Sequence, residues 1–76
     1  MDDGLQKILG LLREEQERQK LPDYELEQRA RLGSGTLSNV WSGRVTPTLK
    51  TIRKLAAALG VSLLALLALA EGSEVV

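Results

Sequence analysis

The side chains best suited to bind a ligand are six basic residues in the middle of the chain. They are Arg29, Arg31, Arg44, Lys50, Arg53 and Lys54. None of the ten acidic residues lies between Gln28 and Ala70, so a net charge of zero conceals a segment of charge +6. Clustered guanidinium and ammonium groups attract phosphates and other polyanions. The neutral total still differs from the basic excess that is usual in nucleic-acid-binding domains.

Catalytic and metal chemistry have little support in the composition. The chain has no cysteine and no histidine, which removes the thiolate nucleophile, the imidazole base and the usual zinc ligands. The carboxylate pairs Glu14/Glu15 and Glu25/Glu27 are expected on solvated helix faces, outside any pocket. The Gly33-Ser34-Gly35 run lacks the lysine, the spacing and the preceding strand of a phosphate loop. We therefore expect no enzyme activity, no cofactor, no metal and no small-molecule substrate.

Five helices are expected to position the basic side chains. Apolar spacing and punctuation place them at about 3–18, 23–30, 34–42, 49–60 and 63–72. Thr48 and Ser62 suit helix starts, whereas Gly43 and Gly60 suit helix ends. The second half of the first helix, from Arg13 to Lys20, is wholly polar and is expected to face water. No alternation of period two persists, so the fold class predicted is all-α.

The length allows one domain, assigned to residues 1–72, with 73–76 as a tail. A core of this size contributes only about 3–5 kcal/mol of net stability. The chain begins with an acidic segment that does not resemble a secretion signal. Its apolar run from Leu63 to Ala70 is shorter than the roughly 20 residues that cross a bilayer. These features predict a cytoplasmic protein without membrane contact.

Between Leu21 and Leu63 the chain resembles the phage repressor and Cro-like, or Xre-like, helix-turn-helix family. The second half of this segment reads T-L-S-x-V-x-x-G-R-x-x-P-T-L-x-T-I-x-x-L-A-x-A-L-G-V-S-L. A helix-turn-helix at about 23–42 is followed by the loop and fourth helix of the family, which makes the match specific. The resemblance implies a compact bundle of about five helices, similar to the lambda repressor domain. It also implies a prokaryotic or phage transcription regulator, a repressor, that binds double-stranded DNA.

The same resemblance assigns the DNA contacts. Base contacts fall on the third predicted helix, at Ser34, Gly35, Ser38 and Asn39. Contacts to the DNA backbone fall at Arg31, Thr36, Ser42, Arg44, Val45, Thr46 and Lys50. Asn39 is the best candidate for reading a base, because a carboxamide can bond to adenine N6 and N7 together.

Three positions depart from the family pattern. Asp23 stands where relatives carry glutamine, and it is expected to cap a helix and to repel a phosphate. Glu27 replaces a small residue, and Arg31 replaces the glycine of the turn, where a left-handed conformation costs about 1 kcal/mol. Asp23, Glu27 and the absence of arginine and glutamine from the third helix favour an alternative function. In it the domain is a protein-interaction module, of the antitoxin or bacterial cell-shape-protein type.

Trp41 is the one tryptophan of the chain and admits two interpretations. It either fills space between the first and third helices or contacts a partner by stacking. The favoured interpretation is the packing role.

The last helix predicts self-association. A small domain can bury one stripe of it, expected to comprise Leu63, Leu66, Leu67 and Ala70. An exposed apolar face usually marks an interface. We therefore expect a homodimer through the remaining face, which carries Leu64, Ala65, Ala68 and Leu69. In the alternative, this face folds under the first helix.

Overall fold

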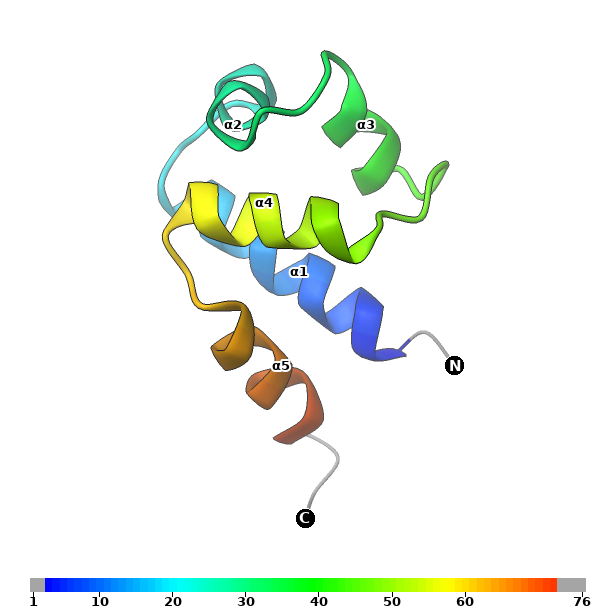
Figure 1. The fold of residues 1–76 in the computed structure, drawn as a ribbon, viewed down its shortest axis with the longest axis vertical. Helices are drawn as coiled ribbons and strands as arrows, with labels where there is room; N and C mark the ends of the chain where they lie inside the picture. Colours follow the sequence, from blue (N-terminus) through cyan, green and yellow to red (C-terminus); the bar gives the residue numbers. More distant parts are fainter. Residues whose placement is uncertain (1–2, 73–76) are drawn as a thin grey trace.

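The computed structural model describes residues 3–72 and contains five helices. They are α1 (Asp3–Arg18), α2 (Asp23–Ala30), α3 (Thr36–Trp41), α4 (Leu49–Leu59) and α5 (Leu63–Gly72). Within this range there is no strand, which confirms the all-α prediction. In Figure 1, α4 crosses the middle of the molecule, with α2 and α3 above it and α5 below. Helix α1 packs against both α4 and α5.

Apolar side chains at helical spacing meet in one core. The largest fully buried side chains come one each from the first four helices, and they are Leu12, Leu26, Leu37 and Leu55. Burial of one leucine side chain contributes about 1.5–3 kcal/mol, so each helix is held mainly by its apolar stripe. Leu66 extends this core into α5.

Helices α1 and α2 end in the same motif. Lys20 and Arg31 adopt left-handed conformations, with φ of 57° and 58°. The next N–H, of Leu21 or Leu32, donates to a carbonyl five residues earlier. This double capping is the Schellman motif, in which glycine usually takes the left-handed position. Each basic residue there costs roughly 1–2 kcal/mol relative to an unstrained conformation.

The polar second half of α1 is only partly solvated, so the expectation that all of it faces water is wrong. Gln16 is buried, and its Nε2 donates to the Leu21 carbonyl at 3.0 Å and to Asp23 Oδ1 at 2.7 Å. Since Gln16 follows Leu12 by four residues, it lies on the buried face of the helix. Its hydrogen bonds connect the end of α1 to the start of α2.

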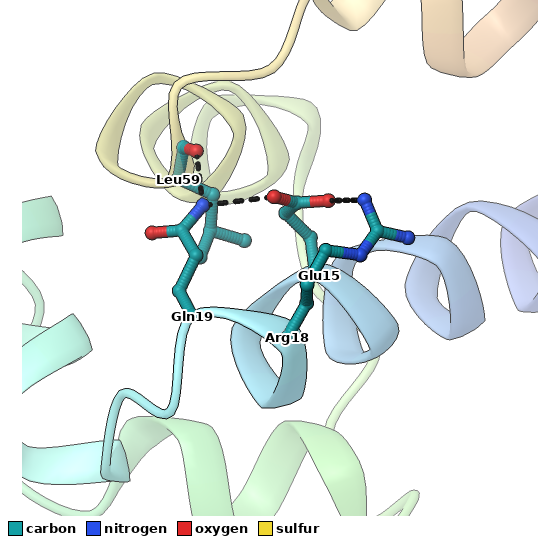
Figure 2. Close-up of polar contacts among 4 residues, drawn as sticks. All are labelled: Glu15, Arg18, Gln19 and Leu59. Carbon is teal, nitrogen blue, oxygen red and sulfur yellow. Dashed lines mark hydrogen bonds and ion pairs between the residues drawn. The ribbon is translucent and has the colours of Figure 1, made fainter.

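A second polar contact joins segments that are far apart in the sequence. Gln19 Nε2 donates to the Leu59 carbonyl at the end of α4, at 2.7 Å (Figure 2). It also donates to Glu15 Oε2 at 3.0 Å, while Arg18 binds the other oxygen of Glu15 at 2.8 Å. Leu59 lies in the last turn of α4, where a carbonyl has no N–H partner within its own helix. Gln19, the residue that follows α1, thus supplies a hydrogen bond that the end of α4 needs.

Helix α5 buries less than expected. Leu66 is buried, as predicted, but Leu63 is only half-buried and Leu67 is 37% exposed, because α5 meets the bundle along a narrow stripe. The side chain of Ala70 lies outside the described residues. The face with Leu64, Ala65, Ala68 and Leu69 is exposed, with Leu64 at 77%. The alternative in which this face folds under α1 is therefore wrong.

Within the described range, no single helix is long and apolar enough to cross a membrane. Only α4 taken together with Leu63–Leu69 reaches that length and hydropathy, as two helices bent by 106°.

Candidate nucleic-acid interface

The candidate interface is centred on the start of α3, and this start differs from the one that the sequence predicted. The helix begins at Thr36, whereas Ser34 and Gly35 form the turn before it. Gly35 has φ of 84°, a left-handed conformation that glycine adopts without strain. This conformation stops the helix from extending back to Ser34.

The N-terminus of α3 is capped from α2. Gly35 has no side chain that could accept a hydrogen bond from the first turn. Instead, Glu27 Oε2 accepts from the Leu37 N–H at 2.9 Å. Glu27 is only 6% exposed, so the expectation that it lies on a solvated face is wrong. Because this carboxylate satisfies an otherwise free donor, it fixes how α3 is seated against α2.

The candidate base-contacting residues share the outer side of this turn and helix. Ser34, Gly35 and Ser38 are exposed, while Asn39 is half-buried, as is the nearby Thr36. No described residue forms a hydrogen bond with the carboxamide of Asn39. Its donor and acceptor atoms are thus not occupied within the fold.

The loop after α3 folds back onto the end of that helix. The Asn39 carbonyl accepts from the Arg44 N–H at 3.0 Å and from the Val45 N–H at 3.3 Å. The Ser42 hydroxyl donates to the same carbonyl at 3.2 Å. Gly43, with φ of 82°, makes the reversal possible. These bonds hold Arg44 next to the helix that carries Asn39.

The candidate backbone-contacting residues are mostly solvent-facing. Ser42, Arg44, Val45, Thr46 and Lys50 are exposed along the loop and the first turn of α4. Thr48 caps α4 as predicted, because its hydroxyl accepts from the Thr51 N–H at 3.2 Å. The segment 42–50 therefore carries most of the proposed contacts to the DNA backbone.

Arg31 belongs to a different group of cations. It lines a hollow of about 280 Å³ between α2 and α4, together with Arg29 and Lys54. Arg29 is paired with Glu25 at 2.9 Å, so part of the positive charge of the central segment is neutralised locally. The hollow and the loop are two separate basic regions, a division that the sequence alone did not reveal.

Asp23 does not cap α2. The N-cap is Pro22, which makes no side-chain cap bond, and Asp23 is the first residue of the helix. Its exposed carboxylate accepts from Gln16, and an acidic residue in the first turn favours the helix dipole. The capping expectation was wrong because the backbone turns into the helix at the proline.

Trp41 packs against the core from α3, as the favoured interpretation predicted. The Arg13 guanidinium lies over its ring, 5.9 Å from the centroid, so α1 covers one face of the indole. Among the described residues, no group of three histidine, cysteine, aspartate or glutamate side chains could hold a metal ion.

Comparison with protein families finds a match to the helix-turn-helix family over residues 9–66. Neither the curated proteins nor the solved structures contain a match to this chain. The matched segment covers all of α2, α3 and α4, including the capped turn and the folded loop. The chain therefore belongs to the Xre/Cro-like helix-turn-helix family of DNA-binding regulators.

Proposed function

We propose that the protein is a transcriptional repressor that reads the major groove of DNA with α3. The observation that carries this proposal is the linkage between Asn39 and Arg44. The backbone of Asn39 holds the N–H of Arg44, and its carboxamide is unoccupied. The main-chain positions that carry the proposed base-reading side chain and the proposed phosphate-binding cation are thus fixed relative to each other. Such a division between positioning and readout is typical of sequence-specific DNA binding.

Glu27 no longer favours the protein-interaction alternative. It is buried as the cap of α3, so its charge is not presented to a phosphate. Of the other two acidic residues of α2, Glu25 is paired with Arg29, which leaves the exposed Asp23 as the unfavourable charge. The proposed contact therefore combines weak electrostatic attraction with hydrogen-bond readout by Asn39 and Ser38.

Two substitutions separate the roles of the interface residues. Asn39→Ala is expected to weaken binding to the preferred site by about 1–3 kcal/mol and to relax one base position. Arg44→Ala is expected to weaken binding to all sequences alike and to flatten the salt dependence by about one unit of slope. Site selection from random duplex DNA, followed by titrations at several salt concentrations, measures both effects.

Arg53→Ala is the matched control, because Arg53 is an exposed cation of α4 outside the proposed contact. It should leave the preferred sequence unchanged. If the wild-type protein shows no salt-sensitive DNA binding at micromolar concentration, the repressor proposal fails. The protein-interaction function then takes its place.

Replacement of Asp23 by glutamine is expected to raise the affinity for DNA. Asp23→Gln removes a negative charge that faces the DNA backbone in this proposal, so affinity should rise at low salt. The same change removes a favourable charge from the first turn of α2, worth about 0.3–1 kcal/mol, and should lower the melting temperature slightly. Fluorescence anisotropy with labelled DNA and a thermal melt measure the two effects. Unchanged or weaker affinity would show that α2 does not approach a phosphate.

The proposed repressor acts as a homodimer through α5. Leu64, Leu67 and Leu69 are exposed on this helix, and Ala65 and Ala68 lie between them. A two-fold axis at this apolar face would present two copies of α3 to successive major grooves, about 34 Å apart. Occupation of such an operator would exclude polymerase.

A further inference from the structure

A groove separates α1 from the loop that follows α3. It has a volume of about 210 Å³ and is open on one side. The residues that matter for its chemistry are Leu5, Leu9, Gly10, Arg13, Trp41 and Val45. Its size suits one ring or a short branched chain, since sites for drug-sized ligands begin at roughly 300 Å³.

Gly10 lines the groove and lowers the stability of α1. It lies in the middle of a 16-residue helix, where glycine is less stable than alanine by about 0.5–1 kcal/mol. No left-handed conformation requires it, and a Cβ built on it meets no atom within 4 Å. At this position the wall of the groove is main chain alone, so a larger side chain would have room to enter the groove.

The charged group of the groove favours an anion, and the other polar side chains that line it, Gln6 and Thr46, are neutral. Arg13 is the one charged residue that lines it, and its guanidinium lies over the Trp41 ring. The ion pair of Arg13 with Glu17 is long, at 4.0 Å, and both side chains are more than half exposed. Such a pair is worth little and yields readily to a better acceptor.

Trp41 adds an unsatisfied donor. Its Nε1 is buried and has no hydrogen-bond partner among the described residues. A buried donor without an acceptor costs about 1–3 kcal/mol. Trp41 lines the groove, so its indole is part of the surface that a ligand would meet.

From these features we infer that the groove binds a small carboxylate with an apolar body. The apolar part lies against Leu5, Leu9 and the Trp41 ring, and the carboxylate faces Arg13. This site needs no DNA, so its test is independent of the proposed function.

The test uses the fluorescence of Trp41, the one tryptophan in the chain. Cyclohexanecarboxylate is the probe, because it does not absorb where tryptophan does, and cyclohexanecarboxamide is its neutral match. The carboxylate should change the emission saturably in the millimolar range. The amide should bind about tenfold more weakly, because it lacks the charge-assisted bond to Arg13. Arg13→Gln should remove that difference between the two compounds.

Gly10→Leu tests the place of binding. The leucine side chain fills the groove while it raises the helix propensity of α1, so the variant should melt higher and lose the fluorescence response. Gly4→Leu is the matched control, because Gly4 lies in the same helix with no atom near its built Cβ and does not line the groove. It should retain the response. Undiminished binding by Gly10→Leu, or equal binding of carboxylate and amide by the wild type, would overturn the inference.

Discussion

Replacement of Leu64 by glutamate is expected to convert a dimer into a folded monomer. Leu64 is the most exposed large apolar side chain of the described residues, and it belongs to the face proposed to pair. A carboxylate there would have to be desolvated without a partner in the dimer, whereas in the monomer it stays in water. Because the two halves of an operator act together, the loss of pairing should weaken operator binding by about 100- to 10,000-fold.

Analytical ultracentrifugation and operator titration measure the two effects of Leu64→Glu. Circular dichroism should show unchanged helix content, since position 64 does not contribute to the core. Leu64→Ala is the graded control, because it removes apolar area without adding charge and should only weaken the dimer. A wild-type chain that sediments as a monomer at hundreds of micromolar, without DNA, would contradict the dimer.

The second large effect is expected at Glu27. Glu27→Ala leaves the Leu37 N–H buried without an acceptor and removes the cap of α3, at a cost of about 1–3 kcal/mol. A domain of this size has only about 3–5 kcal/mol of net stability, so the variant should be substantially unfolded on mild warming. Urea denaturation followed by circular dichroism gives the difference in the free energy of unfolding.

Glu25→Ala is the matched control for Glu27→Ala. It removes the same side chain from the same helix but breaks only an exposed ion pair with Arg29, worth about 0.2–1 kcal/mol. Glu27→Gln keeps an oxygen acceptor and should fall between the two. Equal destabilisation by the two alanine variants would show that Glu27 does not position α3.

Local patterns predicted most of the helices. The bounds of α1 and α2 follow from apolar spacing and from Pro22, and Thr48 and Ser62 both cap the helices they precede. The start of α3 was missed because it depends on the backbone of Gly35, whose conformation is set by the turn between two helices. Periodicity does not encode that geometry.

The buried polar residues were missed for a related reason. Gln16 and Glu27 are polar by type, but their positions follow the buried stripes, four residues after Leu12 and three before Ala30. Spacing alone could have indicated their burial. Their partners, the Leu21 carbonyl and the Leu37 N–H, become visible only when separate helices are packed together. The proposed contacts of α3 and the loop remain predictions that DNA binding experiments test.

The hydrogen bond between Gln19 and Leu59 has a consequence for the order of folding. It joins residues 40 positions apart (Figure 2). In contrast, α2 meets α3, and α4 meets α5, across short connections. Closing the long loop costs chain entropy that local helix pairs do not require. We therefore expect the docking of α1 onto α4 to follow the formation of the local helix pairs.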